Sequence, residues 1–428
     1  MSDSAVYRQR IVDDELTELI PDLAAVALEG PKGVGKTRTA LQYARTVRRL
    51  DDPAEFAVAQ AAPERLLDGE PPVLLDEWQR LPSVWDLVRR RVDDGAPAGS
   101  FLLTGSAVPD QPPTHSGAGR IVSVRMRPFS LAERLGEPTV GVGALLAGRR
   151  EAVTGTTELT VQDYADEVLA SGLPGIRGLS GRARRRQLEG YLERVVDRDV
   201  PDDAGVTIRN PAALRRWMVA YAAASSSTAS FEKIRDAATG GEDRKPSKET
   251  AQNYRDALTR VWVLDEVPAW LPSGSSLREL AQAPKHQLVD PALASELLGA
   301  SRETLLAGRG RLIPGASPDR TLLGALFEGL VTLSLRVYAQ HNEARIGHFR
   351  TSRGRHETDL IIEGRDGGIV AFEVKLARTA TDAHVKHLRW LSEQLGDRLR
   401  DAVVITTGPT AYRRPDGIAV VPAALVGP

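Results

Sequence analysis

Short apolar runs separated by helix-like segments dominate the first third of the chain. The runs at 24–28, at 73–75 and within "GSFLLTGSA" are continuous, which is typical of strands buried on both faces of a sheet. The stretch "PSVWDLVRRRVDDG" has its apolar residues at helical spacing, and a helical pattern also follows the first run. This alternation predicts an α/β fold with a parallel sheet.

A second region of alternating elements occupies the last hundred residues. "DRTLLGALFEGLVTLSLRVYAQ" predicts an amphipathic helix, and "ARIGHFRTSRGRHETDLIIEGRDGGIVAFEVKLA" predicts a strand, a turn and two further strands joined through "EGRDGG". The helix "DAHVKHLRWLSEQLG" and the buried strand "DAVVITTG" follow. This order predicts a separate α/β domain at the C-terminal end.

Helices are predicted between the two α/β regions. A glycine-rich stretch beyond residue 138 indicates a boundary. We therefore divide the chain into domains at 1–138, 139–310 and 311–428.

The middle domain contains a helix-turn-helix pattern. A short helix at 231–238 and a polar turn precede a helix for which Ser247 is a good N-cap, and "VWVLDEVPAWLP" and "KHQLVDPAL" would supply wing strands. We predict a winged-helix-like domain, which would either present its second helix to DNA or only pack on the first domain. In a DNA reader, the contacts would come from Lys245, Lys248, Asn253 and Arg255.

The composition is typical of a soluble globular protein and excludes few classes of function. The 428 residues are 42% hydrophobic and 26% charged with a net charge of -1, so nucleic acid would need a local basic patch. The absence of cysteine excludes disulfides and thiolate zinc sites and is consistent with a reducing compartment. Neither a secretory signal nor an uncharged apolar run of roughly 18 residues is found. We expect a cytoplasmic protein that does not enter a membrane.

The first predicted strand is followed by a phosphate-loop pattern, G-x-x-x-x-G-K-[ST]. The glycines let backbone N–H groups converge on phosphate oxygens. Lys36 would reach the β and γ phosphates of ATP, and the hydroxyl of Thr37 would bind Mg²⁺. The predicted ATP-binding residues of the loop are Gly30, Pro31, Lys32, Gly33, Val34, Gly35, Lys36 and Thr37.

Polar residues end the next two predicted strands. Asp76 and Glu77 follow the run at 73–75, at the strand end where α/β sheets bind ligands. Asp76 would hold Mg²⁺, usually through its water, and Glu77 would polarise the attacking water. Thr104 ends the following strand and would either sense the γ phosphate or serve only as a strand-to-turn residue.

The strand "GGIVAFEVKLARTA" carries Glu373 and Lys375 on one face, because successive strand side chains alternate. This pair is either a solvated face or part of a hydrolytic metal site. Carboxylates at neighbouring strand ends can hold Mg²⁺, and Mg²⁺ together with Lys375 would lower the cost of forming hydroxide.

The chain resembles the AAA-type branch of P-loop ATPases. Within it, the chain is similar to a bacterial and archaeal family, the 4143 domain family, in which an AAA-like module precedes a C-terminal domain of unknown function. The likeness rests on "LEGPKGVGKT", "LLDEWQRLP", "FLLTGSA", "GAGRIVSVRMRPFSLAE", "ASGLPG", "YLERVVDRDV", "ETDLII" and "FEVK". It implies that Arg120 would contact a γ phosphate across a subunit contact, as a catalytic arginine; the alternative is that Arg120 solvates a loop or pairs with Glu133.

The C-terminal order of elements is similar to the PD-(D/E)xK, or restriction-endonuclease-like, fold. This resemblance implies metal ligation by Glu328, Asp359 and Glu373, with Glu373 and Lys375 as catalytic residues. Many members of this fold bind nucleic acid or protein without cutting.

These patterns predict an ATP-binding and ATP-hydrolysing protein that uses Mg²⁺. Its nucleotide state would control a nuclease-like or nucleic-acid-binding C-terminal domain, with DNA as the expected partner and self-association as a second expectation. The alternative is an ATP-gated protein-interaction switch or scaffold whose nuclease-like domain is inactive.

Overall fold

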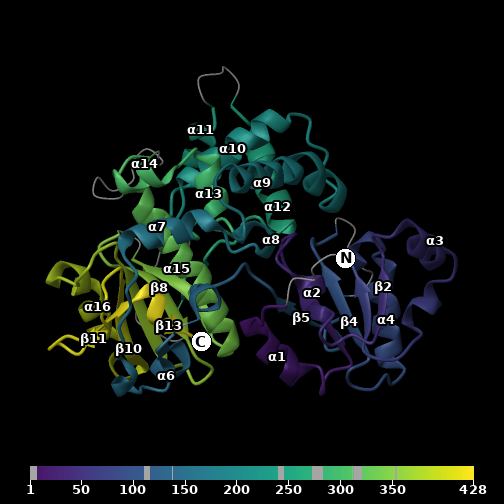
Figure 1. Cartoon of the computed structure of the whole chain (residues 1–428), viewed down its shortest axis with the longest axis horizontal. Helices are drawn as coiled ribbons and strands as arrows, with labels where there is room; N and C mark the ends of the chain where they lie inside the picture. Colours follow the sequence, from purple (N-terminus) through teal and green to yellow (C-terminus); the bar gives the residue numbers. More distant parts are fainter. Residues whose placement is uncertain are drawn as a thin grey trace.

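The computed structural model describes residues 7–109, 116–136, 138–239, 245–271, 283–310, 312, 321–351 and 354–428. Figure 1 shows an N-terminal sheet, a C-terminal sheet and a group of helices above and between them. The polar turn of the predicted helix-turn-helix, at 240–244, lies outside the described residues.

The N-terminal sheet has five parallel strands in the order β2-β3-β4-β1-β5. This confirms the predicted parallel sheet and its three buried strands. Because parallel strands share one carboxyl edge, Glu29, Asp76 and Gly105 end at the same side. The strands are β1 (Ala25–Glu29), β2 (Thr46–Arg49), β3 (Val73–Asp76), β4 (Phe101–Gly105) and β5 (Val122–Arg125).

Helices cover both faces of this sheet. Ala25 and Ala27 of β1 belong to a hydrophobic cluster with α3 and α4, whereas Val26 and Leu28 join a larger cluster that includes α1 and much of the helical region. The alternation of side chains along the strand therefore connects one face of the sheet to the rest of the molecule. The helices of this part are α1 (Ile11–Leu19), α2 (Lys36–Ala40), α3 (Pro53–Ala61), α4 (Ser83–Asp93) and α5 (Leu131–Leu135).

The middle of the chain is helical, as predicted. Ser247 caps α12 by accepting a hydrogen bond from the Thr250 amide. The two predicted wing segments pair antiparallel at Leu264–Leu288 and Val267–Lys285 through isolated bridges, and the winged-helix assignment stays a prediction. The helices are α7 (Val161–Ala170), α8 (Pro174–Arg177), α9 (Gly181–Arg194), the π-helix η4 (Val195–Asp203), α10 (Pro211–Ala223), α11 (Phe231–Ala237), α12 (Lys248–Arg260), α13 (Pro291–Leu297) and α14 (Arg302–Leu306).

The C-terminal sheet has the order β11-β12-β10-β9-β8-β7. Strands β7, β8 and β9 are antiparallel neighbours, and β9, β10 and β12 are parallel. Helix, three strands, helix and strand follow one another as predicted. The elements are α15 (Leu322–His341), β7 (Arg345–Arg350), β8 (Glu357–Glu363), β9 (Ile369–Val374), α16 (Asp382–Leu395), β10 (Leu399–Thr406), β11 (Tyr412–Arg413) and β12 (Ala419–Pro422).

The segment after residue 138 packs on the C-terminal sheet. Strand β6 (Val140–Gly141) pairs in parallel with β13 (Val426–Gly427), and α6 (Val142–Leu146) contacts β9 and β10. The predicted domain boundaries stay a prediction, but a part of the predicted middle domain lies with the C-terminal one.

Helix α15 joins the three parts of the molecule (Figure 1). Among the described residues it is long and apolar enough to cross a membrane, but 83% of its most apolar window is buried. It contacts α1, α5, α7, α13 and β7, so its apolar surface is covered by the chain itself. We therefore interpret α15 as a core helix.

Asp265, in the middle of the chain, pairs with an arginine of the N-terminal part and with an arginine of α15. Its carboxylate lies 2.8 Å from Arg127 and 3.4 Å from Arg336 of α15, and its side chain is only 12% exposed. Burial opposes ionisation, but Arg127 and Arg336 lower the pKa of Asp265 well below its usual range. An uncompensated arginine at this depth is costly, so the contact favours this arrangement of the three parts.

We expect Asp265→Asn to lower the free energy of unfolding by about 3 kcal/mol, because two largely buried arginines lose their counter-ion. Since the folded pKa is depressed, this stabilisation is present above about pH 4 and is lost as the pH falls below it. Urea unfolding of both proteins at pH 7 and at lower pH measures the effect. The control is Asp166→Asn, which removes an exposed pair with Arg302 and should change stability by less than about 1 kcal/mol; equal effects of the two variants would contradict the prediction.

Candidate functional site

The loop between β1 and α2 has a backbone that only glycine accommodates. Gly33 and Gly35 have φ angles of 73° and 107°, which other residues rarely adopt. A Cβ on Gly30 would lie 2.2 Å from the backbone oxygen of Met126. The predicted phosphate loop is therefore formed at the carboxyl edge of the N-terminal sheet.

Lys36 is buried at the end of this loop. Its ammonium donates to the backbone oxygens of Gly30 (2.8 Å) and Pro31 (3.0 Å). Burial lowers the pKa of Lys36 to about 8, although the neighbouring Glu77 and Asp76 oppose the shift. An ammonium held this way by neutral carbonyls would gain from a phosphate oxygen.

Asp76 gathers two hydroxyls from neighbouring elements. Thr37 donates to its Oδ1 at 2.8 Å, and Thr104 donates to the same oxygen. Burial raises the pKa of Asp76, while the hydrogen bonds from Thr104 and Thr37 lower it. A carboxylate and a hydroxyl are ligand types that Mg²⁺ prefers, so the residues present fit this cation. Thr37 and Asp76 are the residues that would hold it.

Glu77 follows Asp76 with a strained backbone, at φ 58°. Its amide donates to the hydroxyl of Thr104 at 3.3 Å. Its carboxylate accepts hydrogen bonds from Ser106 (2.7 Å) and Gln79 (2.5 Å). These contacts hold the carboxylate at the pocket that Lys36 and Thr37 also line.

A pocket of about 520 Å³ lies over the phosphate loop. Lys36, Thr37 and Glu77 line it from the N-terminal domain. The helical region closes its other side with Pro174, Gly175 and Asp203. The site is thus built from two parts of the chain.

Lys32 connects the loop to the π-helix η4. Its ammonium pairs with Asp199 (2.6 Å) and Asp203 (2.5 Å), and Tyr191 donates to its backbone oxygen at 3.2 Å. Burial would lower the pKa of Lys32, but the hydrogen bonds to Asp199 and Asp203 raise it. A residue predicted to bind phosphate is therefore already paired with two acids.

A second pocket of about 520 Å³ adjoins the first. The two share Gly35, Arg38, Pro174 and Gly175. Aromatic and basic side chains provide its distinctive lining: Tyr7, Arg8, Arg10, Phe129 and Arg177. Within this lining, Tyr7 and Phe129 offer contact area for a flat aromatic ring.

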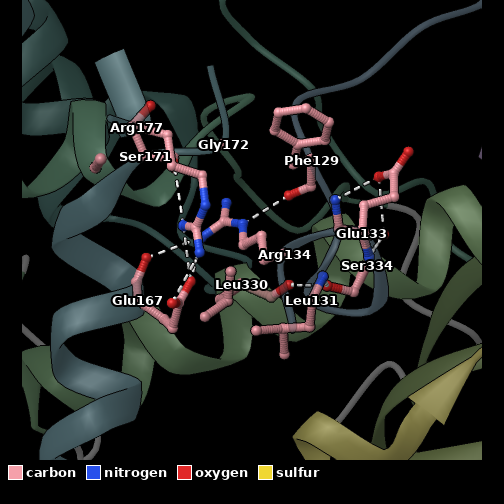
Figure 2. A network of polar contacts seen from close by, with 12 residues as sticks. Phe129, Leu131, Glu133, Arg134, Glu167, Ser171, Gly172, Arg177, Leu330 and Ser334 are labelled. Atoms are coloured by element: carbon pink, nitrogen blue, oxygen red, sulfur yellow. Dashed lines mark hydrogen bonds and ion pairs between the residues drawn. The ribbon is translucent and has the colours of Figure 1, made fainter. Parts of the chain in front are cut away.

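A buried network fixes α8 beside the loop (Figure 2). Arg134, whose side chain is fully buried, donates to the backbone oxygens of Phe129 (2.7 Å) and Glu167 (2.8 Å). Glu167 in turn accepts two hydrogen bonds of 2.9 Å from Arg177 of α8. The amide of Phe129 donates to the oxygen of Gly172 at 2.8 Å. These contacts position Pro174 and Gly175 at the pocket.

Arg120 lies far from the phosphate loop of its own chain. It precedes β5, whose first residue Val122 pairs with Val26 near the amino end of β1. Its guanidinium donates to Asp93 at 2.8 Å. The predicted alternative of a pair with Glu133 is wrong, because Glu133 pairs with Arg10 at 2.9 Å instead. A γ-phosphate contact by Arg120 would need a second chain and stays a prediction.

The C-terminal sheet forms a separate pocket of about 710 Å³. It is lined by Glu328, Asp359, Glu373 and Lys375, so the predicted residues are brought together. Lys375 lies 2.6 Å from Glu373, as the shared strand face predicts. Burial, with the nearby Asp359, raises the pKa of Glu373.

The three predicted metal ligands do not form a metal-binding group. Among the described residues, no three His, Cys, Asp or Glu side chains are arranged to hold a metal ion. The physical reason is the buried Lys285, whose ammonium lies 2.8 Å from Glu328 and 3.0 Å from Asp359. The Mg²⁺ ligation predicted for Glu328, Asp359 and Glu373 stays a prediction, and it would have to displace the Lys285 ammonium from two of these acids.

The basic residues predicted to meet DNA are paired with acids. Lys248 pairs with Glu232 at 2.9 Å, and Lys245 pairs with Asp236 at 3.2 Å. Arg255 pairs with Glu266 at 2.7 Å and lies over the ring of Phe231. Phosphate contacts by these residues would have to displace existing partners.

Comparison with known families assigns three parts of the chain. Residues 23–135 match the AAA domain family, residues 161–304 match a domain of unknown function (DUF8612), and residues 323–426 match another domain of unknown function (DUF4143). The N-terminal part is AAA-like. This agrees with the predicted AAA module and its C-terminal companion; the nuclease-like resemblance stays a prediction.

Whole-chain similarity extends to two mycobacterial proteins. Uncharacterized protein Mb2031c of Mycobacterium bovis and uncharacterized protein Rv2008c of Mycobacterium tuberculosis are each 27% identical over 430 residues, covering 93% of this chain and 80% of theirs. The Walker-type ATPase PABY2304 of Pyrococcus abyssi has 16% identity, with 69% of this chain and 97% of that chain covered, at a TM-score of only 0.41.

Sequence patterns missed several residues of the two sites. "ASGLPG" and "YLERVVDRDV" carried the family likeness without an assigned chemistry, yet they supply Pro174, Gly175 and Asp199 to the phosphate-loop region. Lys285 had no signal beyond a basic residue in a predicted wing strand. Its role depends on a tertiary contact that no local pattern encodes.

We expect Lys32→Ala to loosen η4, because Asp199 and Asp203 lose their shared counter-ion. Partly exposed pairs contribute about 0.5–1 kcal/mol each, so the loss of both should make backbone amides of Val195–Asp203 exchange about five- to thirtyfold faster by hydrogen-exchange mass spectrometry. Lys245→Ala, which removes an exposed pair elsewhere, is the control and should leave this segment unchanged. Unaltered exchange at Val195–Asp203 in Lys32→Ala would show that the pairs do not hold the helix.

Proposed function

We propose that the chain binds and hydrolyses ATP at the phosphate loop and uses the nucleotide state to control contacts among its parts. The observation that carries the proposal is a set of hydrogen bonds next to the buried Lys36. The hydroxyls of Thr37 and Thr104 both donate to Oδ1 of Asp76, and the Glu77 amide donates to the hydroxyl of Thr104. The match of residues 23–135 to the AAA domain supports it.

Each side chain has a role that follows from its position. Lys36 exchanges two backbone oxygens for phosphate oxygens, and its buried charge is then neutralised. Thr37 and Asp76 hold Mg²⁺, which neutralises phosphate charge when bound. Glu77, held by Ser106 and Gln79, orients a water for attack and accepts its proton.

The second pocket provides space for the nucleoside. It continues from Gly35 and Arg38 of the loop and presents Tyr7 and Phe129. The aromatic rings offer contact area for a base, and the surrounding guanidinium groups suit the polar edges of a base and ribose.

Nucleotide binding would also change the contact between the loop and the helical region. Phosphate charge approaching the loop competes with Asp199 and Asp203 for Lys32, because all three are anionic partners of one ammonium. The helical region thereby senses whether the loop is occupied. Self-association would place Arg120 of one chain at the phosphate of another.

For the C-terminal domain we favour a binding role without cleavage. The ion pairs of Lys285 with Glu328 and Asp359 are the observation that favours it. Nuclease activity on DNA is the second candidate, supported by the Glu373–Lys375 pair and the 710 Å³ pocket beside it.

We expect Lys36→Ala to weaken ATP binding about 100-fold or more, because a buried charged contact contributes about 3 kcal/mol. Isothermal titration calorimetry with MgATP measures the loss, and circular dichroism checks the fold. Lys386→Ala on the exposed side of α16 is the matched control and should bind as the unaltered protein does. Undiminished affinity in Lys36→Ala would refute the ATP site.

We expect Glu77→Gln to bind ATP with nearly unchanged affinity while its turnover falls by about 10²–10⁴-fold, because the amide no longer accepts a proton. Steady-state phosphate release and the binding titration together test this. Ser106→Ala, which removes only one hydrogen bond to Glu77, should reduce turnover less. A turnover in Glu77→Gln equal to that of the unaltered protein would assign the role of water activation elsewhere.

A further inference from the structure

The ammonium of Lys285 lies at the centre of the C-terminal carboxylate group. Its Nζ donates to Glu328 Oε1 at 2.8 Å, to Asp359 Oδ1 at 3.0 Å and to the backbone oxygen of Asp359 at 3.2 Å. A lysine ammonium has three N–H donors, so this set uses all of them. The residue is 1% exposed, so these contacts are the ones that compensate its buried charge.

The same oxygens are those that a divalent cation would require. Two carboxylates and a backbone carbonyl are hard oxygen ligands, and Mg²⁺ binds such ligands at about 2.0–2.1 Å. The second oxygen of Asp359 already accepts the Val374 amide at 2.9 Å. An ammonium and a divalent ion cannot share this position, because the centres of positive charge would coincide.

Lys285 is supplied by the helical region rather than by the C-terminal sheet. Its backbone pairs with Val267 through two hydrogen bonds of 2.9 Å. The adjacent His286 packs edge-on against Tyr221 and Phe231 and bonds to the oxygen of Ala229 at 2.7 Å. From this anchored segment the side chain reaches Glu328 and Asp359, two of the acids that line the pocket.

Glu373 differs from the other two predicted C-terminal metal ligands, because its close cationic partner is Lys375 and not Lys285. Its Oε1 accepts from Lys375 at 2.6 Å. Its Oε2 is buried and, within the described part of the chain, has no hydrogen-bond partner. A third carboxylate is thus aimed into the pocket without being fully satisfied, which would complete a cation site if Lys285 were absent.

We propose that Lys285 is an internal counter-ion that takes the place of a divalent metal ion, and that the C-terminal pocket excludes divalent cations while Lys285 is inserted. Removal of the ammonium turns Glu328, Asp359 and Glu373 into a divalent-cation site. This inference concerns the C-terminal pocket alone and does not depend on the ATP site.

The test measures Mn²⁺ binding to the full chain, without nucleotide, by electron paramagnetic resonance. All proteins carry Asp76→Asn, so that the phosphate-loop carboxylate does not contribute. We expect no saturable Mn²⁺ site with Lys285 present, and none with Lys285→Arg, which keeps the positive charge. Lys285→Met should gain one equivalent of bound Mn²⁺ and lose it again when Asp359→Asn is added.

Saturable Mn²⁺ binding in the protein that retains Lys285, abolished by Asp359→Asn, would overturn the proposal. So would a folded Lys285→Met protein that gains no Mn²⁺. If Lys285→Met does not fold, because two carboxylates are left facing each other, Lys285→Met/Glu328→Gln removes that repulsion. This double variant should still gain an Mn²⁺ site through Asp359 and Glu373; if it folds without one, the proposal is wrong.

Discussion

The arrangement of this molecule depends on a guanidinium that has no access to water. The Arg134 side chain is fully buried where α5, α7 and α8 meet, and burial lowers its pKa even though Asp290 and Glu167 oppose the shift. A charge at this depth needs compensating partners, which Phe129 and Glu167 supply to its Nε and Nη1. Because those partners belong to both the N-terminal domain and the helical region, the two parts are held in one relative position. Pro174 and Gly175 therefore line the pocket over the phosphate loop. Figure 2 shows the contacts of Arg134 and Glu167 in this network.

This constraint explains why the pocket over the phosphate loop is shared by two parts of the chain. A loop with glycine at 33 and 35 can shape its own backbone, but it cannot by itself exclude water from Lys36. Met126 and Val34 enclose one side of the loop, and the helical region encloses the other. The contacts of Lys32 with Asp199 and Asp203 then connect the loop's charge state to the position of η4. The phosphate loop and the helical region therefore share one interface, which contains both the pocket and the ion pairs of Lys32.

Local patterns predicted the parts of the molecule whose causes are local. The buried strands, the glycine loop, the Ser247 cap and the i, i+2 spacing of Glu373 and Lys375 each follow from a few adjacent residues, and the structure contains them. The pairing of β6 with β13 was not predictable, since it joins residues almost three hundred positions apart in a stretch with the composition of a linker. Lys285 was missed for the same reason: the charge it neutralises is contributed by α15 and β8, and no periodicity links the three. Glu328 and Asp359 do line one pocket, as predicted, but the cation that they contact is the ammonium of Lys285.

Two lysines make the same kind of contact at the two sides of the helical region, because each pairs with two acids that belong to another part of the chain. Lys32 reaches from the phosphate loop to two acids of η4, and Lys285 reaches from the helical region to two acids of the C-terminal domain. Between them, η4 packs on α10, and Tyr221 of α10 contacts His286, the neighbour of Lys285. Each lysine bridges two parts of the chain through hydrogen-bonded ion pairs, but a competing ion acts differently at the two places. Phosphate would compete with two acids for the Lys32 ammonium, whereas the Lys285 ammonium excludes a divalent cation from the acids that it contacts. A ligand shifts the balance between two arrangements only by its unequal affinity for them. Such inequality arises at both lysines, because phosphate would compete with the carboxylates of Asp199 and Asp203 for Lys32, and a divalent cation would need the position that the Lys285 ammonium occupies.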